Sequence, residues 1–129
     1  MQRSNSEAGT SEIWKATAAT VLTNVTVTST QGSGSYGQSL TVVAFAGAAG
    51  TAATGGMVFA VGNDWDSAIS RLPGANQIMV HEWSNTATGD DFWVQRLTTL
   101  TAAGVPVTLN DTAPTADRWN IAAVEMVSR

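Results

Sequence analysis

The chain of 129 residues contains no cysteine and little charge. Without cysteine, neither a disulfide framework nor a thiolate metal site can form, so packing and hydrogen bonds alone must stabilise the fold. Charged residues make up only 12% of the chain, about half of their usual share in globular domains. The formal net charge is −4 and there is no basic stripe, so nucleic acid is not an expected partner.

The chain also lacks an apolar run long enough for a membrane-spanning helix, so no membrane span is expected. Residues 1–10 contain no hydrophobic stretch of the kind found in signal peptides and are predicted to be a flexible N-terminus. If the protein is exported, its signal lies outside this chain. Threonine, alanine, serine and glycine replace the missing charges, a composition common in exported bacterial proteins. We therefore expect an extracellular or cell-surface location.

Apolar and polar residues alternate with a period of two along most of the chain, which is typical of half-buried β-strands. In residues 24–30, Val25 and Val27 alternate with polar residues, and both valine and threonine favour strands. Strands are predicted at residues 11–17, 24–30, 39–45, 57–61, 77–83, 92–97, 105–109 and 119–127. Roughly eight short strands separated by turn signals predict an all-β, Ig-like or jelly-roll antiparallel β-sandwich that forms one domain.

Two stretches break this alternation. Residues 47–56 consist of glycine, alanine and threonine and are predicted to be a linker, because glycine disfavours a helix. Residues 65–72 are predicted to form one or two helical turns. Asp64 is the expected N-cap of these turns, and Pro73 and Gly74 are the expected stop signal.

Four segments together resemble a module of large secreted or surface proteins of bacteria. They are Ser-Leu-Thr-Val-Val-Ala-Phe at 39–45, Val-Gly-Asn-Asp-Trp-Asp at 61–66, Phe-Trp-Val-Gln at 92–95 and Asn-Asp-Thr-Ala-Pro-Thr-Ala-Asp-Arg-Trp-Asn at 110–120. The resemblance covers most of the chain. It implies an Ig-like or jelly-roll sandwich, often beside adhesion-type or sugar-binding domains, and it implies no activity.

The chain departs from similar modules in two ways. Those modules continue upstream of the start seen here, and they carry an extra strand before the segment that corresponds to Met57. In this chain only Thr54, Gly55 and Gly56 occupy that gap. A missing strand leaves an unpaired sheet edge, so we expect an incomplete sandwich with an open edge near residues 47–57. Such an edge is expected to pair with another copy, another protein or a peptide.

Five oxygen-bearing residues lie at a strand end and in a predicted hairpin loop, and they are candidate calcium ligands: Asn63, Asp64, Asp66, Asp90 and Asp91. Calcium takes six to eight oxygen ligands, which loops of this kind can supply. The alternative is structural: Asp64 caps the following turn, and the paired aspartates form a solvated loop tip. The spacing is not that of an EF-hand, and no other cofactor is expected.

The chain contains five tryptophans. Exposed aromatic rings can stack on sugar rings, so a polysaccharide is a candidate ligand. Trp65 in a turn and Trp83 at a strand end are the candidate platforms. Trp14, Trp93 and Trp119 lie inside predicted strands with apolar neighbours and are expected in the core.

No sequence motif for a nucleophile elbow, a zinc protease or a phosphate loop is present. His81 is the only histidine and is expected to be structural, although a histidine can act as a base near neutral pH. Lys15 is the only lysine. If buried, it is a candidate for an isopeptide cross-link, which requires a lowered pKa; otherwise it is an outward-facing residue that discourages aggregation.

The sequence therefore favours a non-enzymatic structural or adhesive module that pairs an open sheet edge with another chain. A carbohydrate-binding module is the alternative. An enzyme such as a glycoside hydrolase, with a carboxylate pair brought together by the fold, is the third hypothesis.

Overall fold

The computed structural model describes residues 2–3, 11–30, 32, 37–46, 48–49 and 55–128. Within these residues the chain is all-β, with no helix, and every strand pair is antiparallel. The predicted fold class is confirmed. No helix long and apolar enough to cross a membrane occurs in this part of the chain. Most of the predicted N-terminal stretch 1–10 lies outside the described residues.

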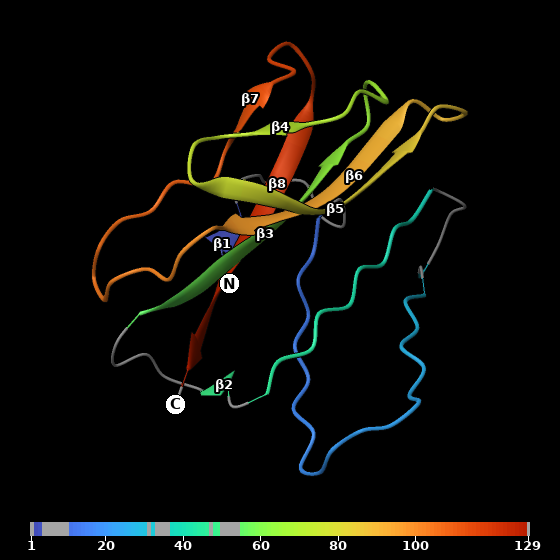
Figure 1. The fold of residues 1–129 in the computed structure, drawn as a ribbon. Helices are drawn as coiled ribbons and strands as arrows, with labels where there is room; N and C mark the ends of the chain where they lie inside the picture. Colours follow the sequence, from blue (N-terminus) through green and yellow to red (C-terminus); the bar gives the residue numbers. More distant parts are fainter. Residues whose placement is uncertain are drawn as a thin grey trace.

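The strands form a large sheet and a small one (Figure 1). The main sheet contains β1 (Gln2–Arg3), β2 (Ala48–Ala49), β3 (Gly56–Asp64), β5 (Gln77–Asn85), β6 (Asp90–Leu97) and β8 (Trp119–Ser128). Its order is β1-β8-β3-β6-β5, and β2 also pairs with β8. The small sheet pairs β4 (Leu72–Pro73) with β7 (Asp111–Ala113).

Both faces of the main sheet contain buried residues, and we call the face under the small sheet the covered face. Its centre is formed by alternate residues of β3 and β6, which pair across the strands: Ala60 with Gln95, Gly62 with Trp93 and Asp64 with Asp91. The chain at the small sheet lies over this face, because Gln95 Nε2 donates a hydrogen bond to the backbone oxygen of Asn110 at 3.3 Å. The two sheets therefore form a sandwich whose second layer is small.

Gly62 permits the closest contact on the covered face. A Cβ atom at this position would lie 2.1 Å from Cζ2 of Trp93, which is almost completely buried. The indole ring therefore lies directly on the backbone of β3. The alternation in β3 predicts an inward position here, and the bulk of the tryptophan explains why it is a glycine.

We expect Gly62→Ala to lower the free energy of unfolding by about 1–3 kcal/mol, because the added methyl group overpacks the core against Trp93. Urea unfolding followed by tryptophan fluorescence measures the change. Gly32→Ala is the matched control, since a Cβ there meets nothing within 4 Å. Equal stabilities of the two variants would contradict this account of the contact.

The predicted open edge near residues 47–57 is not found in the described part of that stretch. β3 pairs with β8 from Gly56 onward, and Ala48 and Ala49 pair with the far end of β8. Thr101 closes the start of β3: its hydroxyl accepts from the Gly56 N–H at 3.1 Å and lies 3.0 Å from the Gly56 carbonyl. The strand that ends the main sheet on one side is instead β5.

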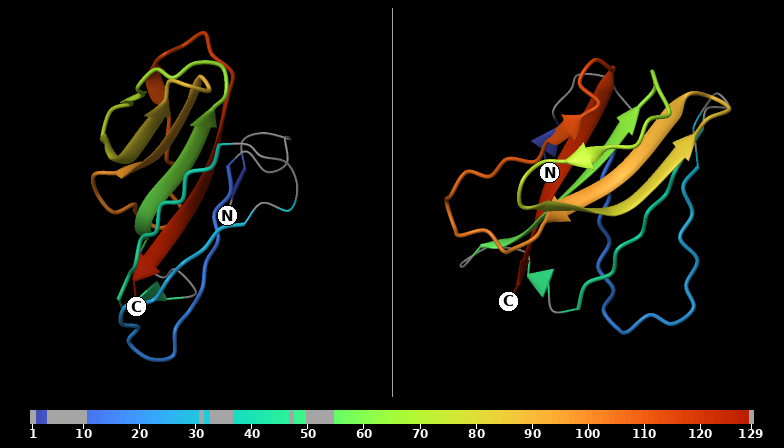
Figure 2. Two further views of the ribbon diagram at one scale, coloured as in Figure 1. Left: turned by 90° about the vertical axis from the view of Figure 1, so that its right-hand side faces the viewer. Right: turned by 45° about the horizontal axis from the view of Figure 1, so that its top comes forward.

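The strands predicted at residues 11–17, 24–30 and 39–45 do not form within the described residues. Figures 1 and 2 show residues 11–30 as extended chain that runs away from the main sheet and returns through residues 37–46. The ring of Phe45 meets that of Phe59 edge-on at 5.4 Å, on the face opposite the covered face. Alternation gives a segment the preference for a strand, but a strand also needs a hydrogen-bonded neighbour.

Two further local predictions are wrong. Residues 105–109 form no strand, and the short strand β7 begins later, at Asp111. Residues 65–72 form no helical turn before β4. The other predicted strands, at 57–61, 77–83, 92–97 and 119–127, are confirmed as parts of β3, β5, β6 and β8.

Candidate functional site

Six ionisable side chains gather between the covered face and the chain that passes over it. We call them the Arg71 cluster: Asp64, Arg71, Glu82, Asp91, Asp111 and Asp117. They come from β3, β5, β6, β7 and the connections that flank β4 and β7. Arginine is the only cation among them, so five carboxylates surround one guanidinium group.

Arg71 lies at the centre of the cluster, and its side chain is completely buried. Its Nη2 donates to Oδ2 of Asp64 and, at 3.3 Å, to Oδ2 of Asp117. The guanidinium carbon lies 4.7 Å from the centroid of the Trp93 ring, within the range of a cation–π interaction. One side chain therefore connects β3, β6 and the segment before β8.

Asp64 serves both the loop and the cluster. Its Oδ1 accepts hydrogen bonds from the backbone N–H groups of Asp66 at 2.7 Å and Ser67 at 3.2 Å. The capping role predicted for Asp64 is thus present, although no helical turn follows it. The other carboxylate oxygen binds Arg71, so both oxygens are occupied by the protein itself.

The charges of the remaining carboxylates are less well compensated by hydrogen bonds and by Arg71. Oδ1 of the fully buried Asp91 accepts a hydrogen bond from the Ser84 hydroxyl at 2.5 Å. Oε1 of Glu82 accepts a hydrogen bond from the backbone N–H of Arg71 at 2.6 Å. Burial raises the pKa of Asp64 and of Asp91 above the usual range for aspartate. Burial also raises the pKa of Asp111 to about 6, against the opposing effects of Arg71 and Gln95.

The raised pKa of Asp111 makes stability depend on pH. Folding favours the protonated acid, so its contribution is complete below the ordinary pKa of 3.8 and is lost as the pH rises through about 6. The original chain should therefore lose free energy of unfolding between pH 4 and pH 7. In Asp111→Asn this loss should be smaller by about 1–2 kcal/mol, a range that allows for solvent screening. Urea unfolding at a series of pH values measures it.

Asp66→Asn is the control for this pH dependence, because Asp66 lies at the surface and pairs with the exposed Arg118 at 2.7 Å. The change in pH dependence should be larger in Asp111→Asn than in Asp66→Asn. Equal changes in the two variants would contradict the role given to the burial of Asp111.

The five predicted calcium ligands lie in three places. Asp64 and Asp91 belong to the Arg71 cluster, and the Asn63 side chain donates to the backbone oxygens of both. Asp66 pairs with Arg118 at the surface, and Asp90 accepts from the Thr88 hydroxyl at 2.6 Å in the hairpin. Within the described residues, no three His, Asp or Glu side chains are arranged to hold a metal ion.

The tryptophans differ from one another in their surroundings. Trp93 is buried as predicted, whereas Trp14 is 86% exposed and Trp119 is 43% exposed, so the prediction that these two lie in the core is wrong. Of the two predicted platforms, Trp65 is half-buried. Trp83 is 41% exposed and stacks on Phe92, with ring centroids 5.4 Å apart.

Neither His81 nor Lys15 lies in the cluster, and both side chains are exposed. A register shift between Met79 and His81 in β5 places His81 opposite Val94, on the face that faces away from the cluster. The side chains of His81 and Met79 therefore lie on opposite faces of the sheet. The exposed position of Lys15 does not provide the desolvation that a cross-linking lysine needs.

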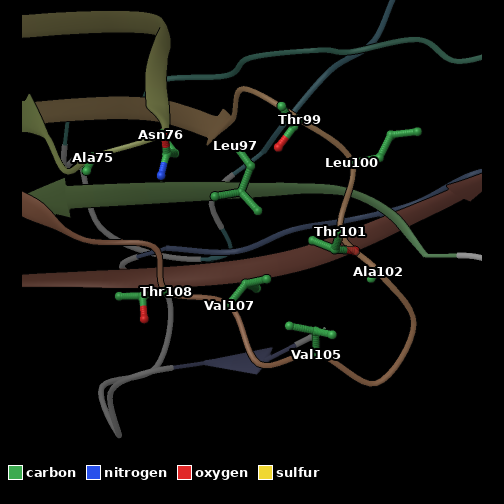
Figure 3. Close-up of a pocket in the computed structure, with 10 residues that line it drawn as sticks. All are labelled: Ala75, Asn76, Leu97, Thr99, Leu100, Thr101, Ala102, Val105, Val107 and Thr108. Atoms are coloured by element: carbon green, nitrogen blue, oxygen red, sulfur yellow. The ribbon is translucent and has the colours of Figure 1, made fainter.

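A groove of about 390 Å³ lies beside the end of β6 (Figure 3). Four large apolar residues line it, Leu97, Leu100, Val105 and Val107, together with threonine, alanine and asparagine side chains. Figure 3 shows these side chains coming from the end of β6, from the loop that follows it and, for Ala75 and Asn76, from the turn before β5. The lining contains no titratable side chain, so the groove offers no group for acid–base chemistry.

Sequence reasoning missed Arg71, Gln95 and Asp111 as members of a polar site. One signal was present: Asp64 and Asp91 continue the inward alternation of β3 and β6, which indicates buried carboxylates rather than loop ligands. A buried carboxylate requires a cation or donor nearby. The position of that cation depends on the path of the chain after β3, which periodicity does not specify.

Comparison with known proteins adds no relative to this description. No family model matches the chain, and no curated protein and no solved structure matches it either.

Proposed function

We propose that the chain is a non-enzymatic structural or adhesive module of a bacterial extracellular protein, and that it joins another chain by β-pairing. The observation that carries this proposal is the large exposed apolar surface of residues 11–46. Nine large apolar residues of this part are exposed: Trp14, Val21, Leu22, Val25, Val27, Leu40, Val42, Val43 and Phe45. A large exposed apolar surface is typical of an interaction site.

The small apolar core of the described residues supports the same conclusion. The described residues bury only seven apolar side chains, so a second chain would complete a core that this chain leaves small.

The chemistry of the described residues favours a structural role over an enzymatic one. The Arg71 cluster is enclosed, with the side chains of Asp64 and Arg71 fully buried. The groove beside β6 is open but lacks titratable groups. The extracellular setting is inferred from the hydroxyl-rich, weakly charged composition. The proposal includes no cofactor.

If residues 24–30 mediate assembly, replacing Val25 and Val27 together by serine should shift the chain toward the monomer, because it removes the apolar side of the segment. Light scattering coupled to size-exclusion chromatography measures the mass against the 13.4 kDa of one chain. Replacing Thr26 and Thr28 by serine is the matched control, since it changes the polar side of the same segment and should leave the mass unchanged.

Hydrogen exchange of residues 24–30 completes this test. A chain that stays monomeric at high concentration, with these amides protected, would contradict the proposal, because the segment would then be paired within its own chain. A monomer with unprotected amides leaves pairing with a different protein as the proposed role.

A second candidate function is carbohydrate binding, favoured by Trp83. Its exposed ring is held in place by the stack on Phe92, and a fixed, exposed ring is the platform that sugar stacking needs. Trp65 contributes less ring surface because it is half-buried.

This candidate predicts that the chain is retained on an insoluble polysaccharide and that Trp83→Ala removes the retention. Trp14→Ala is the control, because Trp14 is more exposed and should be dispensable if the Trp83–Phe92 stack is the platform. Pull-down against a panel of polysaccharides measures it. Failure of the original chain to bind any of them, or equal loss in both variants, would exclude Trp83 as a sugar platform.

A further inference from the structure

We propose that the partner is a second copy of this chain, and that residues 24–30 of each copy pair with the free edge of β5 of the other. This inference rests on the proposed function and adds to it the partner and the site. It joins two unpaired features of one chain: an extended segment without a strand partner in the described residues, and the terminal strand of a sheet.

The donor segment has the chemistry of a buried edge strand. Val25 and Val27 are 55% and 51% exposed, and they alternate with threonines that would face outward. Residues 16–30 contain no charged side chain, so pairing would bury no uncompensated charge. Asn24 has a positive φ of 53°, a turn conformation that separates this segment from the chain before it.

The acceptor edge is β5, a strand of nine residues that ends the main sheet. A long edge strand with exposed apolar side chains is a template for pairing with another chain. Ile78, Val80 and Trp83 on this strand are 39%, 41% and 41% exposed. The seven residues of 24–30 fit within the length of this edge.

The faces of the two elements are compatible. Ile78 pairs with Arg96 and Trp83 with Phe92, so both lie on the face opposite the covered face. A segment added beside β5 with Val25 and Val27 on that face would extend the row of apolar side chains that Ile78 and Trp83 form. The covered face cannot accept the segment at its centre, because the Arg71 cluster and the small sheet already occupy it.

The symmetry favours a second copy as the occupant. Each chain carries both the donor segment and the acceptor edge, so two copies can satisfy each other in a closed, two-fold arrangement. Pairing with a different protein would use only one of the two features of each chain.

Disulfide trapping tests the inference without background thiols, because the chain contains no cysteine. One untagged preparation carries Val25→Cys or Val27→Cys, and a tagged preparation carries Ile78→Cys or Val80→Cys. The two are mixed, oxidised and analysed by intact mass. We expect at least one of the four combinations to form the mixed disulfide in severalfold higher yield than the control.

The control preparation carries Trp119→Cys in place of the β5 cysteine. Trp119 is 43% exposed, as exposed as the β5 positions, but it lies on β8, three strands away from β5 in the sheet. Mixed disulfides between the segment and this position should stay at background. Equal yields with β5 and with β8 would overturn the inference, because they would report random collision.

The remaining outcomes separate this inference from the proposed function. An assembled protein whose thiols link only segment to segment, or do not link at β5, overturns the inference and leaves assembly by another surface. A monomer with unprotected residues 24–30 also overturns it, since the partner would not be a second copy. A monomer in which these residues are protected overturns both proposals.

Discussion

The contact between the guanidinium group of Arg71, the carboxylate of Asp64 and the ring of Trp93 holds the two layers of this domain together. The three groups come from the loop before β4 and from the two central strands. Because the surrounding side chains are mostly carboxylates, this one cation offsets the repulsion among them. Removal of one partner of a buried ion pair costs about 3–5 kcal/mol in other proteins, since the remaining charge stays buried. The second layer therefore depends on polar contacts more than on apolar packing.

This constraint explains why the domain is small in its apolar core. The covered face buries Asp64, Asp91 and Gln95 at positions where a sandwich usually places aliphatic side chains. The opposite face has no second sheet in the described residues, and the edge-on contact of Phe45 with Phe59 is part of its partial cover. The opposite face buries Val94 and Ala122 at its centre but leaves Ile78 and Trp83 of β5 exposed. Association at β5 would supply burial that the chain alone does not provide.

The sequence predicted the central strands well and the N-terminal strands wrongly, although both show the same alternation. β3, β6 and β8 find neighbours within the chain, whereas residues 24–30 have the pattern of a strand without a described partner. Local sequence sets side-chain preference, but pairing depends on distant segments. The position of Arg71 in the cluster could not be predicted for the same reason: Arg71 and Asp117 are 46 positions apart. Asp64 and Asp91, two of the five predicted calcium ligands, pair across β3 and β6, and the described cation beside Asp64 is a guanidinium group.

The two proposals and the Arg71 cluster are physically connected. Because the cluster fixes the small sheet on the covered face, residues 11–46 cannot complete the sandwich there without displacing a buried ion pair. The surfaces left to them are the opposite face and the free edge of β5. Residues 37–46 already run along part of the opposite face through Phe45. The segment 24–30 is thus left with an edge that its own chain has not used, and a second copy presents the same edge with its own segment free. Reciprocal pairing satisfies both chains at once, which one chain pairing with an unrelated partner does not achieve.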